Sequence, residues 1–234
     1  MQKKDKIYEG KAKILYTTED PALLIQYFKD DATAFNAQKR GTIAQKGVMN
    51  NAIASKIFEA LTKKGIKSHF VKQLSDRDML VKRVNIVPLE VIVRNRAAGS
   101  MCRMLGLAEG LTLSCPVVEF CYKKDELGDP LINEYHIRAL NIATDAEVAQ
   151  IKDQALLINK ALSEFFLGLK IELIDFKLEF GRVEGTIILA DEISPDTCRL
   201  WEVGTGNKLD KDRFRRDLGN VEGAYQEVLR RVSQ

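Results

Sequence analysis

Hydrophobic residues recur at three- and four-residue spacing in three stretches of the chain, which places them on one face of an α-helix. The first stretch covers residues 46–64 and is followed by a glycine, and the last covers residues 221–232. The strongest pattern covers residues 144–168, where Thr144 and Glu147 have the spacing of a capping box. We predict a helix over each of these stretches.

Alternation of hydrophobic and polar residues, which is typical of β-strands, occupies much of the remaining chain. Segments with this pattern lie at residues 6–17, 23–29, 68–73, 79–84, 91–93, 171–180 and 186–193. Apart from one helix, residues 1–84 are strand-like and predict a small antiparallel sheet. We expect mobile loops at residues 37–47 and 204–210, and residues 101–141 predict an irregular region.

The segment of residues 171–201 predicts a β-hairpin with one apolar and one charged face. On its first strand, isoleucine, phenylalanine and leucine side chains alternate with Asp175, Lys177 and Glu179. A Glu184–Gly185 pair, which is a signal for a tight turn, separates the two strands. The hairpin can therefore bury one face, which we expect to pack on the preceding helix, and present carboxylates and a lysine on the other.

The position of Asp191 on this hairpin depends on the turn. A two-residue turn places Asp191 opposite Leu178, on the apolar face, whereas a three-residue turn with a glycine bulge places it opposite Glu179. We prefer the second register, because a carboxylate is costly to bury on an apolar face.

Opposed carboxylates repel one another unless a cation lies between them. Carboxylate oxygens suit Mg²⁺, which binds one or two carboxylates together with substrate phosphates. The pattern by itself is equally compatible with the solvated face of an ordinary hairpin.

Two other segments have features that suit anionic ligands. Gly10 lies at a bend between two strands and is followed by Lys11 and Lys13, so backbone N–H groups and lysine charges can approach a phosphate. Arg94 stands at a strand end before a turn of small residues that reaches Ser100, which can seat an anion. The alternatives are a surface hairpin with exposed lysines and surface arginines at a strand end.

Composition narrows the class of protein. The chain has 234 residues, of which 45% are hydrophobic and 29% charged, and no apolar run is long enough to span a membrane. Its four cysteines have no C-x-x-C spacing and it has two histidines, which argues against a zinc site or a disulfide framework. We therefore expect a cytoplasmic protein whose chemistry rests on carboxylates, lysines, arginines and a metal ion. The net charge of +3 suits small anionic substrates and is too small to indicate nucleic-acid binding.

Several longer motifs occur in order along nearly the whole chain. They are Y-E-G-K-A-K at 8–13, K-D-D-A-T-A-F-N at 29–36, V-P-L-E-V-I-V-R-N-R-A-A-G-S at 87–100, D-P-L-I-N-E at 129–134, D-F-K-L-E-F-G at 175–181, D-E-I-S-P-D-T-C-R-L-W at 191–201 and K-D-R-F-R at 211–215. With these motifs the sequence closely resembles the SAICAR synthetase family.

The resemblance implies an α+β, two-lobed ATP-grasp-like fold related to that of protein kinases. Residues 1–84 would form a small antiparallel lobe that covers the nucleotide, and residues 85–234 a larger mixed lobe with the metal and substrate site. The implied activity is ATP-dependent ligation of L-aspartate to the carboxylate of the imidazole nucleotide CAIR, through an acyl phosphate, in de novo purine synthesis. The implied cofactors are ATP and Mg²⁺, and the implied assembly is a homodimer.

The same resemblance implies roles for individual residues. The expected ATP-binding residues are Lys11, Ala12, Lys13, Lys82 and Val84. The expected metal ligands are Glu179 and Asp191. The expected CAIR-binding residues are Arg94, Ser100, Asp196, Arg199 and Arg215, and the expected catalytic residues are Lys177 and Asp175. The aspartate pocket is not assigned, although residues 129–134 are a candidate.

Two other functions fit parts of the pattern. A small-molecule or protein kinase would use the same acidic pair and lysines. A nucleic-acid-binding module would use the basic run from Arg213 to Arg216, but acidic residues are interspersed there and few aromatic residues are available for stacking. Neither nucleic acid nor a membrane is an expected partner.

Overall fold

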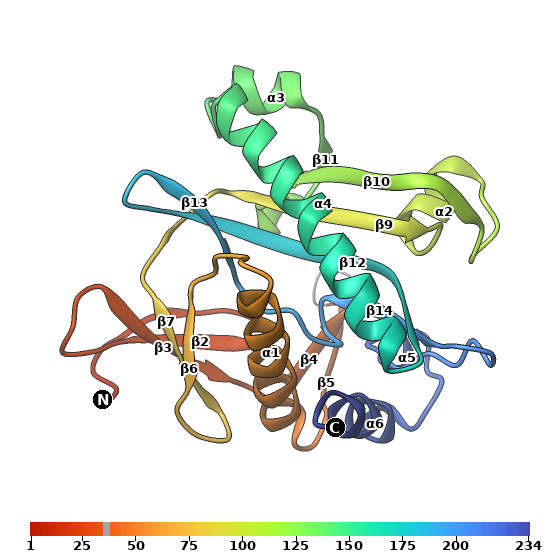
Figure 1. The fold of residues 1–234 in the computed structure, drawn as a ribbon, viewed down its shortest axis with the longest axis horizontal. Helices are drawn as coiled ribbons and strands as arrows, with labels where there is room; N and C mark the ends of the chain where they lie inside the picture. Colours follow the sequence, from red (N-terminus) through yellow and green to blue (C-terminus); the bar gives the residue numbers. More distant parts are fainter. Residues whose placement is uncertain (35–37) are drawn as a thin grey trace.

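Two antiparallel sheets organise the chain in the computed structural model, which describes residues 1–34 and 38–234. The first sheet lies within residues 6–82 (Figure 1). Its strands, in spatial order, are β1 (Lys6–Glu9), β2 (Lys13–Thr17), β3 (Leu23–Phe28), β7 (Asp78–Lys82) and β6 (Phe70–Gln73). Helix α1 (Lys46–Lys63) packs against β3, β6 and β7. The predicted small antiparallel sheet with one helix is confirmed.

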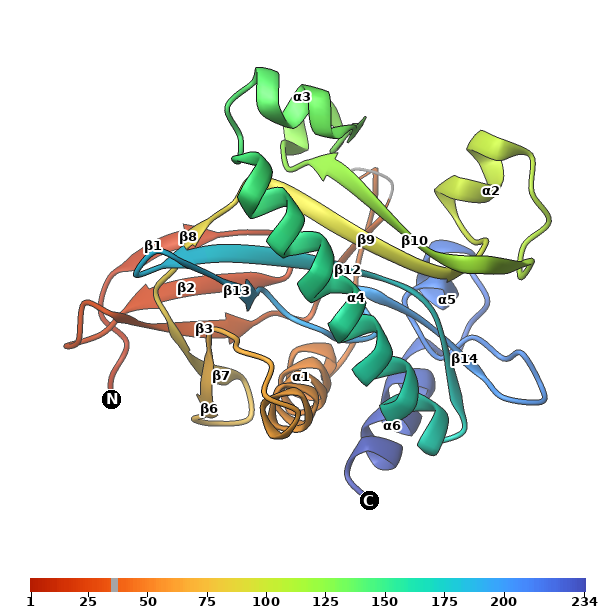
Figure 2. The same ribbon diagram turned by 45° about the horizontal axis from the view of Figure 1, so that its top comes forward.

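The second sheet contains the long strand β12 (Ile171–Val183) at its centre. Its main order is β11 (Leu131–Ile132), β10 (Thr112–Tyr122), β9 (Leu89–Arg96), β12 and β13 (Thr186–Ala190). Two further strands, β8 (Asn85–Ile86) and β14 (Cys198–Glu202), also pair with β12. Helix α4 (Asp145–Gly168) crosses β12 and β9 obliquely in both views (Figures 1 and 2). The predicted packing of the hairpin on this helix is therefore confirmed.

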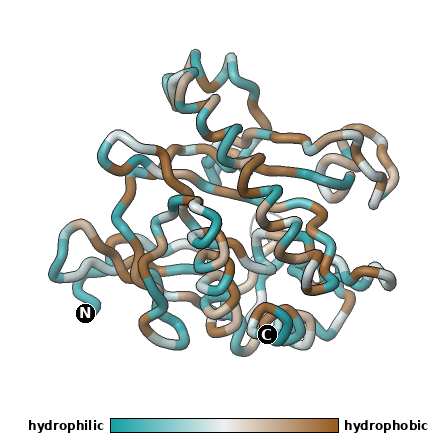
Figure 3. Tube along the Cα trace, in the orientation of Figure 1, coloured by the Kyte–Doolittle hydropathy of each residue, from teal (hydrophilic) through white to brown (hydrophobic). Residues whose placement is uncertain are grey.

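The three helices predicted from periodicity form where their patterns indicate. Thr144 and Glu147 make the reciprocal hydrogen bonds of the predicted capping box at the start of α4. Helix α6 (Val221–Val232) buries Tyr225 and Val228 and packs against α1. A short helix, α5 (Asp212–Arg215), occupies the basic segment before it. Hydrophilic and hydrophobic residues are mixed along the helices, as expected for helices with one buried face, and the N-terminal residues are hydrophilic (Figure 3).

The prediction that residues 101–141 are irregular is wrong. This region contains α2 (Ser100–Leu105), the 3₁₀ helix η1 (Asp125–Leu127), α3 (Glu134–Ala139) and the eleven-residue strand β10. Strand β10 was hidden because its first half is largely exposed and contains Pro116. The pairing of β10 with β9 shifts register between Thr112 and Val117, and such an irregularity accommodates a residue without an N–H group.

A second hairpin was also missed. Strand β4 (Asp31–Ala34) pairs with β5 (Lys39–Thr42), which lies in the stretch of residues 37–47 that we predicted as a mobile loop. Both strands have four residues, which is too short for alternation to identify them. The end of the motif at residues 29–36 and the start of the expected loop at residues 37–47 lie outside the described residues.

The register that we preferred for the β12–β13 hairpin is wrong. Val183 pairs with Thr186, so the turn contains only Glu184 and Gly185, and Glu179 lies opposite Ala190. Both turn residues have positive φ, at 48° and 74°, which is the backbone of a type I′ turn. Our preference assumed that the strand continues through Asp191. Instead, β13 ends at Ala190 and Asp191 has a left-handed φ of 60°, which takes its side chain off the apolar face.

The two sheets are joined by backbone contacts between residues 67–69 and β13. Ser68 and Leu189 form an isolated parallel bridge. The N–H of His69 donates to Leu189 O at 2.8 Å, and the N–H of Leu189 donates to Lys67 O at 3.2 Å. A continuous apolar core that includes Phe58 and Phe180 extends across the junction. In the described part of the chain, no helix has the length and apolar character needed to cross a membrane.

Candidate active site

A cavity of about 750 Å³ lies between the two sheets and is lined by residues of both. Every site residue expected from the sequence lines this cavity. From the first sheet and the connection after it come Lys11, Ala12, Lys13, Lys82 and Val84, and from the second sheet and the segments after it come Arg94, Ser100, Asp175, Lys177, Glu179, Asp191, Asp196, Arg199 and Arg215. The motifs, which are far apart in the sequence, are therefore brought to one place.

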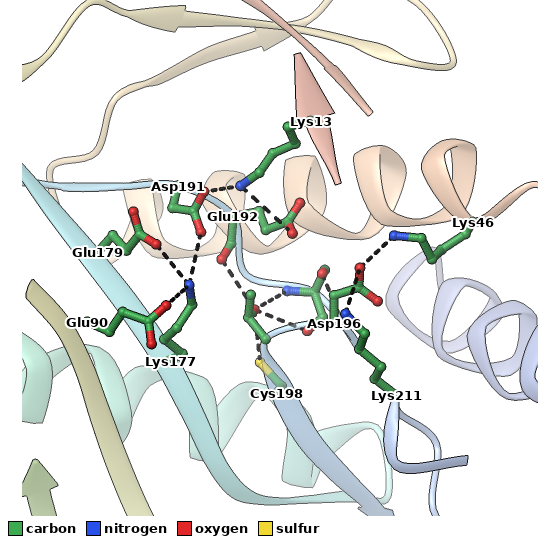
Figure 4. Close-up of polar contacts among 12 residues, drawn as sticks. Lys13, Lys46, Glu90, Lys177, Glu179, Asp191, Glu192, Asp196, Cys198 and Lys211 are labelled. Atoms are coloured by element: carbon green, nitrogen blue, oxygen red, sulfur yellow. Dashed lines mark hydrogen bonds and ion pairs between the residues drawn. The ribbon is translucent and has the colours of Figure 1, made fainter. Parts of the chain in front are cut away.

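The centre of the cavity is a cluster of lysines and carboxylates on β12 and its neighbours (Figure 4). Lys177 Nζ lies 2.7 Å from Glu90 Oε1 and 2.8 Å from Glu179 Oε1, and Lys123 Nζ lies 2.7 Å from the same Glu179 oxygen. Burial by itself would lower the pKa of Lys177, but the charges of Glu179 and Glu90 outweigh it and raise this pKa above its ordinary value. Burial of Glu179 is likewise outweighed by Lys177 and Lys123, which hold the pKa of this carboxyl at about 2. Both groups are therefore charged at neutral pH.

Asp191 reaches this cluster from the loop after β13. Its carboxylate pairs with Lys13 of β2, and its Oδ2 lies 3.9 Å from Lys177 Nζ. The Nε2 of His69 lies 2.8 Å from the backbone oxygen of Asp191. Burial, followed by the charge of Lys13, lowers the pKa of His69 to about 3. The imidazole is therefore neutral at physiological pH and donates its Nε2–H to this carbonyl.

Glu179 and Asp191 fit a Mg²⁺ ion whose remaining ligands come from a substrate. Both carboxylates lie within 4 Å of Lys177 Nζ, although they are not paired across the hairpin. Among the described residues, no group of three or more His, Cys, Asp or Glu side chains could hold a metal by itself. Close by, the Oε2 of Glu192 is buried and has no hydrogen-bond partner in the described part of the chain. The donor set therefore suits an ion that is completed by phosphates.

A second cluster surrounds Asp175, which precedes Lys177 on β12. Its carboxylate accepts from Arg94 Nη1 at 2.8 Å and from Arg199 Nη1 at 2.7 Å. The Arg94 side chain is 2% exposed, and it also donates to Ser100 Oγ at 2.8 Å and to Glu119 Oε2 at 2.9 Å. Because its N–H groups are used in this way, Arg94 fixes the positions of Asp175 and Ser100 in the cavity wall.

Asp196 belongs to a buried network that ties the loop after Asp191 to two helices. Its carboxylate accepts from Lys46 Nζ of α1 and from Tyr225 OH of α6, each at 2.6 Å, and Lys211 Nζ lies 3.9 Å away. Burial by itself would raise the pKa of Asp196, but the charges of Lys211 and Lys46 keep it below its ordinary value. Together with the pair between Asp191 and Lys13, these contacts fix the loop of residues 191–196.

Two further contacts lie where the first sheet and the connection after it meet the rest of the molecule. Lys11 Nζ forms an ion pair at 2.8 Å with Asp125 across the rim, and both side chains are largely exposed. Val84 lies against Gly181 of β12, where an added Cβ would come within 2.4 Å of Val84 Cγ2. The absence of a side chain at Gly181 therefore lets the connection between the sheets approach β12 closely.

A family model described as SAICAR synthetase matches residues 6–232 of the chain. The chain belongs to the SAICAR synthetase family. It is 61% identical, over the full length of both chains, to a protein of Caldanaerobacter subterraneus subsp. tengcongensis named phosphoribosylaminoimidazole-succinocarboxamide synthase. The crystal structure of the synthase of that name from Ehrlichia chaffeensis superposes with a TM-score of 0.96, at 48% identity and 98% coverage of each chain. A SAICAR synthetase (Type-2) in complex with ADP superposes with a TM-score of 0.93, at 46% identity and 96% coverage of each chain.

The resemblance inferred from the motifs is thus confirmed, and the mixed α+β fold with antiparallel sheets is that of SAICAR synthetase structures. Several residues in this SAICAR synthetase cavity were nevertheless missed by sequence reasoning. They are Gln26, His69, Glu90, Lys123, Glu192 and Lys211. Glu90 lies within the motif at residues 87–100 and Glu192 follows Asp191, so proximity to a motif was an available signal for these two. Lys123 follows the unrecognised strand β10, and no pattern indicated its proximity to Glu179.

Proposed function

We propose that this protein is an ATP-dependent ligase that joins L-aspartate to the carboxylate of CAIR, giving SAICAR in de novo purine biosynthesis. The observation that carries the proposal is that one cavity collects all the site residues expected from the family motifs. Membership of the SAICAR synthetase family and the likeness to a member in complex with ADP support the use of ATP.

In this proposal the nucleotide lies against the first sheet. The bend at Gly10 brings Lys11, Ala12 and Lys13 over the phosphates, since a glycine bend exposes backbone N–H groups to an anion. The backbone of Lys82 and Val84 borders the adenine. Residues 1–84 then form a nucleotide-covering lobe and residues 85–234 a substrate lobe, in the two-lobed ATP-grasp-like arrangement expected from the family.

Glu179 and Asp191 would hold Mg²⁺, which when bound neutralises phosphate charge during transfer. The chain's own lysines assist from both sides of these carboxylates. Lys13 comes from the first sheet, and Lys177 from the second. Because phosphoryl transfer depends mainly on positioning and charge neutralisation, a cavity with a neutral histidine and several lysines suits it.

The reaction has two steps. A carboxylate oxygen of CAIR attacks the γ-phosphorus of ATP, the bond from that phosphorus to the β–γ bridging oxygen breaks, and ADP leaves. The amine of L-aspartate then attacks the acyl-phosphate carbon, phosphate leaves with the C–O bond electrons, and the nitrogen loses a proton. In this proposal Lys177 and Asp175 act beside the reacting groups.

The nucleotide substrate lies against the second sheet in this proposal. The residues that bind it are Arg94, Ser100, Asp196, Arg199 and Arg215. Arg199 and Arg215 flank Asp212, whose carboxylate accepts from Arg199 Nε at 2.9 Å and from Arg215 Nη1 at 2.7 Å. This carboxylate orients the two guanidinium groups while leaving a positive surface for a phosphate. A cytoplasmic homodimer is part of the same proposal.

A coupled assay tests the activity. The purified protein should release phosphate from ATP only when CAIR and L-aspartate are both present, and mass spectrometry should detect SAICAR in equal amount. A kinase would instead leave the phosphate on its acceptor and release none. Phosphate release without aspartate, or a stable phosphorylated product, would refute the ligase function.

A further inference from the structure

Gln26 is a polar residue among apolar side chains on one wall of the cavity. It lies in β3, is 3% exposed and lines the cavity. Its Nε2 is buried and has no hydrogen-bond partner among the residues that the structure describes. A buried donor without an acceptor is costly, so its presence at a cavity wall indicates that a ligand supplies the acceptor.

The neighbours of Gln26 offer no such acceptor from their side chains. Leu15 of β2 and Met79 of β7 lie directly opposite it on the adjacent strands. Leu24, which shares its face of β3, is paired with Val81 of β7. Leu15, Leu24 and Val81 all line the cavity with Gln26. The amide is therefore a single hydrogen-bonding group within an apolar surface, a pattern typical of a site that fixes the orientation of a ligand.

The position of Gln26 along β3 relates it to the proposed nucleotide. At one end of this strand Phe28 pairs with Lys13, which contacts Asp191 in the cluster of lysines and carboxylates, and at the other end Leu23 pairs with Lys82. Gln26 lies between these two ends. A nucleotide whose base is near Lys82 and whose phosphates are near Lys13 must pass over this amide.

We infer that Gln26 binds ATP by donating a hydrogen bond from Nε2 to an acceptor on the nucleoside half, a base nitrogen or a ribose oxygen. The inference rests on the proposed ATP site and adds to it a side-chain contact that orients the nucleoside. The other proposed contacts at the base come from backbone groups of Lys82 and Val84. A purine with a different arrangement of hydrogen-bond donors and acceptors can also approach these groups.

The test is the variant Gln26→Met, in which an unbranched side chain of similar length lacks the amide. Without nucleotide, its melting temperature should equal or exceed that of the wild type, because the unpaired donor is gone. The rise in melting temperature on adding ADP should be smaller than in the wild type. The KM for ATP should rise between about two- and twelvefold, the range for one hydrogen bond, with little change in kcat.

A matched control is Ser55→Ala. The Oγ of Ser55 is also buried without a partner among the described residues, but it lies on α1 and does not line the cavity. This variant should retain the full stabilisation by ADP. If Gln26→Met is stabilised by ADP as strongly as the wild type, the inference is wrong. If ADP fails to stabilise the wild type itself, the proposed function is wrong instead.

A second measurement covers the case in which Gln26→Met does not fold. In the wild type, the side-chain amide resonances of Gln26 in a ¹⁵N NMR spectrum should shift on titration with ADP, and their exchange with water should slow. Resonances of Gln26 that do not move at saturating ADP would overturn the inference independently of any variant.

Discussion

The replacement Asp191→Asn separates the charge of this residue from its shape. Asparagine has nearly the same volume and tolerates the left-handed φ of 60° found at this position, so the loop should keep its path. The charge lost is the one that pairs with Lys13 and lies 3.9 Å from Lys177 Nζ. Lys13 keeps a second carboxylate, because its Nζ is 3.8 Å from Glu192 Oε1. We therefore expect a folded protein that is less stable by about 2 kcal/mol.

The effect on the reaction should be much larger. Removing one preorganised electrostatic contact raises a barrier by about 3 kcal/mol, and each ~1.4 kcal/mol is a factor of ten. Mg²⁺-dependent release of phosphate should therefore fall on the order of a hundredfold or more. The assay is a Mg²⁺ titration of turnover at saturating substrates, with unfolding in urea measured on the same sample.

The control is Asp125→Asn, the same chemical change at the rim of the same cavity. Asp125 pairs with Lys11, but both side chains are largely exposed, and such pairs contribute little. Its turnover should stay within about threefold of the wild type on these grounds. Wild-type turnover in a folded Asp191→Asn variant would refute the metal assignment.

Three other replacements probe the supporting structure. Glu147→Gln should lower the free energy of unfolding above pH 4.5. This loss relative to the wild type should shrink as the pH falls toward 2, the depressed pKa of the Glu147 carboxyl, and urea unfolding at several pH values measures it. Tyr225→Phe removes the donor 2.6 Å from Asp196 and should lower the free energy of unfolding by about 2 kcal/mol, measured in urea; no change would mean that this bond is not stabilising. Gly99→Ala places a Cβ 2.4 Å from a guanidinium nitrogen of Arg199, at a φ of 57°. Calorimetry should therefore show a loss of roughly 1–3 kcal/mol in the free energy of unfolding, and the KM for CAIR should rise.

The parts of the fold that the sequence predicts are those in which local periodicity and packing agree. Helix α4 has a capping box and a long apolar face, and it forms where both indicate. Strand β10 has neither signal, because its exposed half and Pro116 obscure the alternation, and its pairing with the preceding strand β9 changes register part-way. Local alternation does not reveal such an irregular pairing.

The sequence likewise predicts some features of the site and not others. The motifs identify Glu179 and Asp191, but they do not show how the two carboxylates meet. The turn at Glu184 and Gly185 gives a register that separates them along the strands, and the left-handed backbone at Asp191 then returns its side chain to the cavity. Alternation of residue types cannot predict a single left-handed φ angle, because it assumes that the strand is extended throughout.

The junction between the sheets has a consequence for how the cavity can widen. At one end, residues 67–69 are fixed to β13 by two backbone hydrogen bonds and to Asp191 by the imidazole of His69, and Ser68, His69 and Leu189 are buried. At the opposite rim, the described contact between Lys11 and Asp125 is a solvent-exposed ion pair. The first connection therefore costs more to break than the second. Loss of the rim contact would leave the bond from His69 to the backbone of Asp191 intact, so a ligand that passes the β1–β2 turn would not disturb the proposed metal site.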